Sequence, residues 1–271
     1  MNTIKASALQ SLKYTAVDAT WFMPNSGKNA KTEYIRERIP GARFFDVDEI
    51  KSPSPYPHMM PSKAVFEAAV SKLGLMASDT ILVYDKSNIF SSPRVYWMFQ
   101  QFGHKHLYLL DNWAEYLSLN LPLESGEPDS IQPTVYESPE TGKWVEFEEM
   151  VKLAQDPNYV VLDARPANRF YGQAPEPRPG LSNGHVPGAI SLPFGDVLSG
   201  GHYRPIEEIK QLLEDRKVDV SKQVVCMCGS GVTACVIKYA IDPLLARPAL
   251  VYDGSWTEWA QRSTSIEGAS D

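Results

Sequence analysis

The chain has 271 residues and runs twice through one order of predicted strands and helices, which limits its possible folds more than any other feature. In the first half, the predicted elements are a short strand and polar loop at 17–21, a Pro-Gly turn and strand at 38–48, a loop at 52–61, a helix at 64–73, a strand at 80–85, a helix at 92–102, and a strand at 107–110 that is closed by 111–116. In the second half, they are a strand at 160–165, a Pro-Gly turn and strand at 184–193, a helix at 206–213, a strand at 223–227, a helix at 233–241, and a strand and turn at 250–259. The interval from Asp18 to Asp85 nearly equals the interval from Asp163 to Cys228. We therefore predict two copies of one folding unit.

The alternation of short apolar strands with helices indicates the fold class. Such strands favour a mainly parallel sheet with helices on both faces, so we predict an α/β protein with two tandem domains of this kind. Leu123 to Gly142 is proline-rich and has little periodicity, which predicts a linker at 123–142. The N-terminal domain would then cover 1–122 and the C-terminal domain 143–271.

Composition excludes several classes of function. The net charge of −7 argues against direct nucleic-acid binding, because neutralising phosphates requires clustered Lys and Arg. No apolar run reaches the roughly 20 residues of a membrane span, so no membrane association is expected. The three cysteines form a poor disulfide framework and indicate a reducing compartment. We expect the protein to be located in the cytoplasm. The mitochondrion is a second candidate, because residues 1–17 contain lysines and no acidic residue, as transit peptides do. These residues lack arginine, however, and fit an ordinary first helix better than a transit peptide.

No metal and no cofactor are expected. Cys226 and Cys228 have no second cysteine pair and no histidine nearby in the sequence, which argues against a zinc site. His104 and His106 precede a strand and fit surface positions better than metal ligands.

Val225 to Ala234, which read V-C-M-C-G-S-G-V-T-A, connect a predicted strand to a predicted helix. Gly229 and Gly231 let the backbone curl, so that consecutive N–H groups point inward as an anion-binding nest. The start of the helix adds positive potential at the same place. A cysteine beside such a nest is favoured as the nucleophilic thiolate, which makes Cys228 a candidate nucleophile. A small buried cysteine before a glycine-rich turn fits this local pattern equally well.

Five motifs carry a resemblance to a known family. They are D-A-R-x-x-x-R-F at 163–170, P-E-P-R at 175–178, G-H-V-P-G-A at 184–189, C-G-S-G-V-T-A at 228–234 and Y-D-G-S-W-T-E-W at 252–259. With these motifs the chain resembles the tandem rhodanese-domain sulfurtransferases, and most closely the 3-mercaptopyruvate sulfurtransferases, including fungal relatives that serve tRNA thiolation. Asp85 stands where the second copy has Cys228, and an aspartate cannot carry a transferable sulfur. Only the second copy is therefore expected to be catalytic.

Neighbouring families differ at the residues that follow the cysteine. Thiosulfate-specific rhodaneses place a cationic pair there, whereas this chain has Gly229 and Ser230, so we expect thiosulfate to be a poor donor. The related cysteine phosphatases need an arginine six positions after the cysteine to hold phosphate, and Ala234 occupies that position. A phosphatase is therefore not expected.

The resemblance implies roles for individual residues. Cys228 would be the nucleophile, and a relay of Ser230, His58 and Asp48 would move protons, with Asp46 as the alternative to Asp48. Substrate-binding residues would be the two arginines and the loop residues that form the nest: Arg169, Arg178, Gly229, Gly231, Val232 and Thr233. Cys226 would either receive sulfur from Cys228 or be a small buried strand residue.

The implied function is that of an enzyme that takes the sulfur of 3-mercaptopyruvate onto Cys228 as a persulfide and releases pyruvate. The acceptor would be a thiol, thioredoxin or cyanide. One alternative is a protein-to-protein sulfur carrier in tRNA wobble-uridine thiolation, loaded by a cysteine desulfurase and unloaded by an activating enzyme. The other alternative is a thiosulfate:cyanide sulfurtransferase.

Overall fold

The computed structural model describes residues 1–24, 26–139 and 142–268. These residues form two compact units. The first unit comprises Met1–Pro53 and Met60–Lys143, and the second comprises Ser54–Met59 and Trp144–Asp271. The short segment Ser54–Met59 thus joins the second unit although its neighbours in sequence belong to the first.

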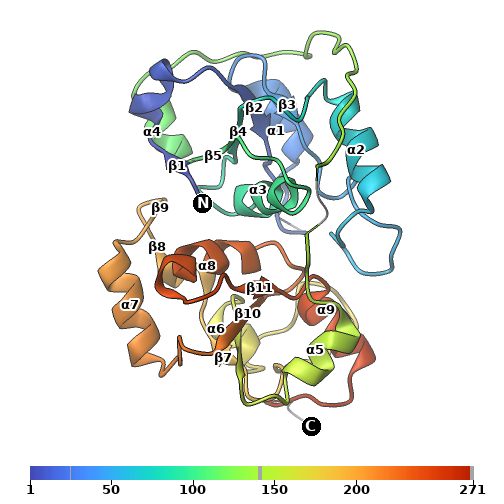
Figure 1. Ribbon diagram of the computed structural model, residues 1–271, viewed down its shortest axis with the longest axis vertical. Coiled ribbons are helices and arrows are strands. Elements are labelled where there is room, and N and C mark those ends of the chain that lie inside the picture. The colour runs from blue at the N-terminus through green and yellow to red at the C-terminus, as the bar shows by residue number, and fades with distance from the viewer. Residues whose placement is uncertain (25, 140–141, 269–271) are drawn as a thin grey trace. The chain divides into compact units, whose positions relative to one another are not determined.

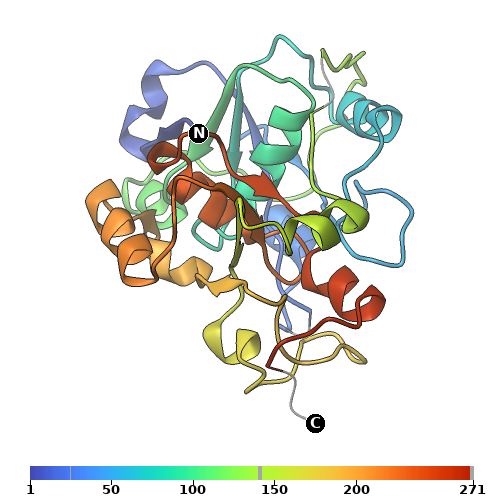
Figure 2. The same cartoon turned by 60° about the horizontal axis from the view of Figure 1, so that its bottom comes forward.

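The first unit contains a parallel sheet of five strands in the order β1-β5-β4-β2-β3 (Figure 1). Its strands are β1 (Thr3–Ile4), β2 (Thr15–Asp18), β3 (Arg43–Phe44), β4 (Ile81–Tyr84) and β5 (Leu107–Leu110). Its helices are η1 (Ala6–Ser11), α1 (Ala30–Arg36), α2 (Lys63–Lys72), α3 (Ser92–Gln101) and α4 (Trp113–Ser118). Figure 2 shows helices on either side of the blue and green strands of this unit.

Both faces of β4 are buried, which explains its continuous apolar sequence. Leu82 and Tyr84 belong to a core with residues of η1, α1 and α4. Because successive strand residues point to opposite faces, Val83 faces the other layer, where α3 packs on β4 and β5.

The second unit contains a parallel sheet of four strands in the order β11-β10-β6-β7 and a separate antiparallel pair, β8-β9. Its strands are β6 (Tyr159–Asp163), β7 (Ile190–Ser191), β8 (Leu198–Ser199), β9 (His202–Tyr203), β10 (Gln223–Met227) and β11 (Leu250–Val251). Its helices are α5 (Phe147–Leu153), α6 (Ala167–Phe170), η2 (Phe194–Val197), α7 (Ile206–Asp215), α8 (Ala234–Ile241), η3 (Asp242–Leu244) and α9 (Ser255–Arg262).

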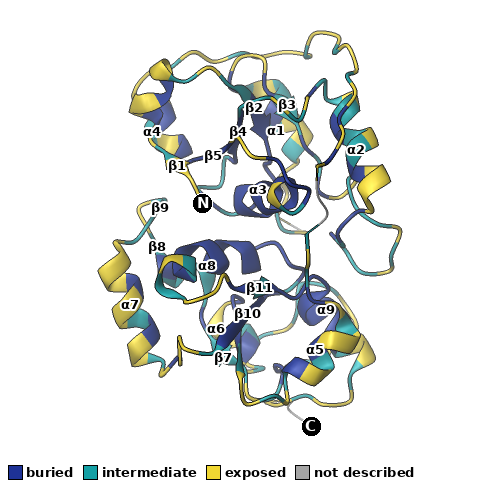
Figure 3. Cartoon of the chain, viewed as in Figure 1, coloured by how far each residue is buried: buried dark blue, intermediate teal, exposed yellow. Residues whose placement is uncertain are grey.

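Strand β10 lies in the middle of this sheet and ends directly before Cys228. Val225 and Met227 pack in a core with residues of α5 and α9. Cys226 points to the opposite face, where α8 packs on β10. Figure 3 shows α8 in dark blue along its length, in agreement with the burial of all its residues. The predicted α/β fold, with two parallel sheets covered by helices, is therefore confirmed.

Described residues of the predicted linker at 123–142 contact the first unit. Glu124 pairs with the buried Arg38, and Ser138 donates its backbone N–H to Glu67 at 2.6 Å. Tyr136 is buried in an aromatic cluster with Phe66. These residues therefore pack on the first unit, because they carry side chains that complete its core. Residues 140–141 of the predicted linker lie outside the described residues.

The expectation that His104 lies at the surface is wrong. Its side chain is buried between Asp79 and Tyr136, while His106 is exposed as expected. In the part of the chain that the structure describes, no helix has both the length and the apolar character needed to cross a membrane.

Candidate active site

Residues 228–233 form the loop that leads from β10 into α8. Cys228 is 2% exposed and has a free thiol. Gly231 has φ +76°, in the left-handed region, which lets the chain reverse direction before the helix. Among the described residues, the backbone N–H groups of Gly229, Ser230, Val232 and Thr233 donate to no acceptor. The loop therefore presents hydrogen-bond donors for an anion, as the predicted nest requires.

The start of α9 holds the first two residues of this loop in place. The backbone N–H of Cys228 donates to Ser255 Oγ at 3.1 Å, and the carbonyl of Cys228 accepts the N–H of Trp256 at 2.9 Å. The carbonyl of Gly229 accepts both the N–H and the hydroxyl of Thr257, at 2.9 and 2.6 Å. Ser255 and Thr257 were not among the residues predicted from the sequence, although both lie in the Y-D-G-S-W-T-E-W motif that carried part of the resemblance.

His58 and Ser230 are brought together as predicted. His58 Nδ1 lies 2.9 Å from Ser230 Oγ, although the two residues are far apart in the sequence. Both residues are buried, and His58 has φ +61°, an uncommon conformation for a residue with a side chain. The contact lies within the second unit, because that unit includes the segment Ser54–Met59 that carries His58.

Asp48 and Asp46 belong to the first unit. Asp48 Oδ2 accepts the indole N–H of Trp21 at 2.9 Å, and Asp46 Oδ1 accepts the backbone N–H of Asp48 at 2.9 Å. Burial raises the pKa of Asp46, and the adjacent Asp48 and Glu49 raise it further against the backbone hydrogen bond from Asp48. The choice between Asp48 and Asp46 as third member of the relay stays a prediction.

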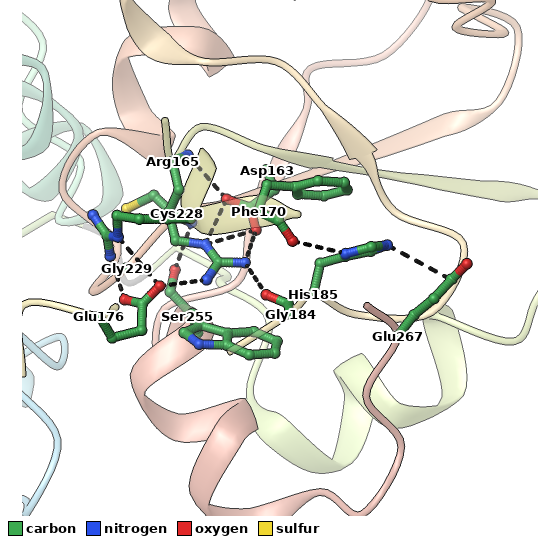
Figure 4. Close-up of polar contacts among 12 residues, drawn as sticks. Asp163, Arg165, Phe170, Glu176, Gly184, His185, Cys228, Gly229, Ser255 and Glu267 are labelled. Carbon is green, nitrogen blue, oxygen red and sulfur yellow. Dashed lines mark hydrogen bonds and ion pairs between the residues drawn. The ribbon is translucent and has the colours of Figure 1, made fainter. Parts of the chain in front are cut away.

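Two arginines and two carboxylates form a connected chain beside the loop (Figure 4). Arg165 is buried over the ring of Trp256 and binds both oxygens of Asp163, at 2.7 to 3.2 Å, as well as the carbonyl of Gly184 at 2.9 Å. Burial alone lowers the pKa of Arg165, but the carboxylates of Asp163 and Glu176 outweigh it and raise that pKa. Arg165 therefore has a structural role.

Arg169 lies at the end of α6 and faces the loop. Its Nε donates to Glu176 Oε1 at 3.2 Å, and its Nη2 binds Glu176 Oε2. A Cβ atom at Gly229 would lie 3.1 Å from Arg169 Nη2, so the guanidinium lies directly against the residue that follows Cys228. Arg178 lies in the proline-rich loop after α6 and is half-buried. Glu176 belongs to the P-E-P-R motif, but no role was predicted for it from the sequence.

The other two cysteines are buried and free. Burial raises the pKa of Cys226 far above that of an exposed thiol, and nearby Asp242 adds to the effect. Cys226 is therefore held as a neutral thiol, which favours the interpretation as a buried strand residue. Among the residues that the structure describes, no group of three or more His, Cys, Asp or Glu is placed to hold a metal ion.

Two α/β units, of which the second carries a cysteine loop at the end of β10, define a known class of proteins. The Rhodanese-like domain matches this chain twice, at residues 9–115 and 146–262, and the chain belongs to the rhodanese family.

The similar proteins are sulfurtransferases by name. A probable 3-mercaptopyruvate sulfurtransferase of Schizosaccharomyces pombe is 38% identical over 270 residues, which cover 94% of this chain and 91% of the relative. The 3-mercaptopyruvate sulfurtransferase of Rattus norvegicus is 41% identical over 263 residues, with coverages of 94% and 87%. Thiosulfate sulfurtransferase TUM1 of Saccharomyces cerevisiae is 38% identical over 268 residues, with coverages of 91% and 88%. The crystal structure of the Tum1 protein from that yeast superposes with a TM-score of 0.91 at 35% identity, covering 100% of this chain and 99% of that one.

Proposed function

We propose that this protein is an enzyme that transfers the sulfur of 3-mercaptopyruvate through a persulfide on Cys228 to a thiol, releasing pyruvate. One observation carries the proposal: Cys228 begins a loop in which the N–H groups of Gly229, Ser230, Val232 and Thr233 donate to no acceptor among the described residues, and the guanidinium of Arg169 lies against Gly229. The candidate nucleophile and a guanidinium that can bind a carboxylate thus lie at the same loop. The names of the similar proteins agree with this activity.

The first half-reaction places one sulfur atom on the enzyme. The Cys228 thiolate attacks the sulfur of 3-mercaptopyruvate, so that an S–S bond forms and the bond between that sulfur and C3 breaks. The electron pair of the broken bond stays on C3 as the pyruvate enolate, and one proton converts the enolate to pyruvate. In the second half-reaction, an acceptor thiolate attacks the outer sulfur of the persulfide, leaves as a new persulfide and restores the Cys228 thiolate.

Ser230 and His58 would move the proton that the enolate needs. The 2.9 Å contact between His58 Nδ1 and Ser230 Oγ allows a proton to pass between imidazole and hydroxyl. Ser230 lies two residues after Cys228, in the same loop. Asp48 is proposed to orient His58 as the third member of the relay, with Asp46 as the alternative.

Substrate oxygens would be bound by arginine. The planar guanidinium binds a carboxylate bidentately and stays charged, which suits the carboxylate and ketone of 3-mercaptopyruvate. We assign this role to Arg169 and, from the P-E-P-R motif, to Arg178. The backbone N–H groups of Gly229, Gly231, Val232 and Thr233 would surround the sulfur that becomes the persulfide.

The acceptor is proposed to be a small thiol, thioredoxin or cyanide in a reducing compartment, either the cytoplasm or the mitochondrion. The same persulfide would also serve a sulfur carrier that a cysteine desulfurase loads and a tRNA-thiolation activating enzyme unloads. Thiosulfate is the second candidate donor, because one similar protein is named thiosulfate sulfurtransferase. The absence of charge on Gly229 and Ser230 favours the monocarboxylate donor over this dianion.

Pyruvate release from 3-mercaptopyruvate, with a small thiol as acceptor, tests the proposal. We expect turnover by the wild-type protein, no turnover by Cys228→Ser, and normal turnover by the matched control Cys226→Ala. Mass spectrometry after donor treatment should show one added sulfur on the peptide that contains Cys228. Equal or faster reaction with thiosulfate would reject 3-mercaptopyruvate as the preferred donor, and an unmodified Cys228 would reject the persulfide mechanism.

A further inference from the structure

Glu176 is the one acidic side chain whose carboxylate contacts Arg169 among the hydrogen bonds and ion pairs described for that arginine. Its side chain is 2% exposed, although it lies on a loop. Pro175 and Pro177 flank it and fix the backbone φ on both sides, so the loop directs this carboxylate inward. Burying a carboxylate costs solvation free energy, and this cost is offset here because the carboxylate is paired with two guanidinium groups.

The carboxylate of Glu176 contacts both of those arginines. Oε1 accepts from Arg165 Nη1 at 2.8 Å and from Arg169 Nε at 3.2 Å, while Oε2 binds Arg169 Nη2. Arg165 also binds Asp163 and is 1% exposed, so it offers nothing to a substrate. Arg169 is 14% exposed and remains accessible. Glu176 therefore determines where the accessible guanidinium lies and how much of its charge is balanced.

The charges of this chain of contacts cancel. Asp163 and Glu176 supply two negative charges, and Arg165 and Arg169 supply two positive charges. A sulfur donor that approaches Cys228 thus meets the guanidinium of Arg169, which has N–H groups with no acceptor among the described residues. The carboxylate of Glu176 lies directly behind that guanidinium. A donor with one negative charge can bind those donor groups, whereas a second negative charge gains less attraction because Glu176 repels it.

We propose that Glu176 is a specificity-determining residue that positions Arg169 and, by balancing its charge, selects a monoanionic sulfur donor over a dianionic one. This inference rests on the proposed function. The dianion used as probe is thiosulfate, whose outer sulfur would pass to the Cys228 thiolate as an S–S bond forms, while the bond to the central sulfur breaks and sulfite leaves with its electron pair. No oxidant or further reactant is needed in either reaction.

The test compares kcat/KM for 3-mercaptopyruvate with kcat/KM for thiosulfate in the purified full-length chain. Glu176→Gln keeps the size and hydrogen-bonding capacity of the side chain but removes its charge. We expect the ratio of the two values to shift toward thiosulfate by about tenfold or more, since an unbalanced unit charge within several ångströms changes binding by at least that factor. A constant ratio in Glu176→Gln would overturn the proposal, even if both activities fell.

Two further variants separate charge from position. Glu176→Asp keeps the charge and shortens the reach, so we expect both activities to fall while the ratio stays within about twofold of wild type. Glu267→Gln removes a carboxylate that contacts His185, away from Arg169, and should leave the ratio unchanged. Far-ultraviolet circular dichroism and thermal unfolding show whether Glu176→Gln is folded. Should it not fold, Glu176→Asp carries the test: because this variant keeps the charge, a donor ratio that moves toward thiosulfate would overturn the charge argument.

The outcomes distinguish this inference from the proposed function. If the wild-type protein releases no pyruvate from 3-mercaptopyruvate, the proposed function fails. If it releases pyruvate but the donor ratio of Glu176→Gln equals that of wild type, only the role of Glu176 fails.

Discussion

The carboxylate of Asp85 accepts hydrogen bonds from both the backbone N–H and the hydroxyl of Ser92, at 2.8 and 2.6 Å. The same oxygen accepts the N–H groups of Phe90 and Ser91, at 2.9 and 3.0 Å, so three consecutive N–H groups converge on it at the start of α3. Asp85 follows β4 as Cys228 follows β10. The carboxylate of Asp85 thus occupies the anion-binding nest of the first unit.

This arrangement also indicates what the loop of the second unit can hold. The terminal oxygen of an aspartate lies two bonds from Cβ, and so does the outer sulfur of a cysteine persulfide. The turn between β4 and α3 therefore places N–H groups where they stabilise a negative atom two bonds from Cβ, as they do at Asp85. In the Cys228 loop, several N–H groups have no acceptor among the described residues, so this loop is suited to the same task.

Asp85→Ala should destabilise the protein by about 3 kcal/mol, because the substitution leaves several buried N–H groups without an acceptor. Urea unfolding measures the loss, and formate, which resembles the missing carboxylate, should restore part of it. Asp129→Ala, at an exposed position, is the matched control. A loss no larger than that of the control would show that Asp85 does not hold the loop.

Ser230→Ala should lower kcat for pyruvate release by about 100-fold with a smaller change in KM, because the relay loses the hydroxyl that contacts His58. His58→Gln should have a similar effect. Since both residues act in one proton path, the double variant should be little worse than either single variant. Additive losses would mean that the two side chains act independently.

Gly229→Ala should raise KM for 3-mercaptopyruvate several-fold, because its methyl group would lie 3.1 Å from Arg169 Nη2 and displace the guanidinium. The free energy of unfolding should change by less than about 1 kcal/mol, as is usual when no core packing is lost. Gly195→Ala introduces a methyl group with no atom within 4 Å and serves as the control. An unchanged KM in Gly229→Ala would remove Arg169 from the substrate site.

His104 should make the stability of the protein depend on pH. Its Nε2–H donates to the carbonyl of Asp79 at 2.8 Å, so Nδ1 accepts the hydroxyl of Tyr136 at 3.0 Å, and burial lowers the pKa of the ring below 6.5. The unfolded chain therefore takes up a proton near pH 6.5 that the folded chain does not, and the free energy of unfolding falls as pH decreases below that value.

The measurement is urea unfolding between pH 7.5 and about pH 5, the range in which histidine titrates. His104→Gln should show a smaller decrease than wild type, and the exposed His106→Gln should behave like wild type. If His104→Gln retained the full decrease, other groups would account for it.

Local patterns in the sequence were sufficient for the fold and for the loop that carries Cys228. Apolar runs bounded by turn residues predicted β5 at 107–110 and β10 at 223–227 with the bounds that the structure has. The repeated order of elements predicted the two α/β units, and the placement of Cys228 before two glycines at the end of a strand predicted its loop. These features depend on neighbours within a few positions of one another, which is why they can be predicted from the sequence.

The supporting contacts were decided by the tertiary structure. Glu176 reaches Arg165 and Arg169, Ser255 binds the N–H of Cys228, and the segment that carries His58 joins the second unit. Each contact joins residues whose separation in sequence follows no period, and each depends on how loops fold back over the sheet. The sequence by itself therefore determined the units, the motifs and the candidate nucleophile, whereas folding in three dimensions determined which buried charges and hydrogen bonds surround it, because such pairs form only once loops and distant segments have folded together.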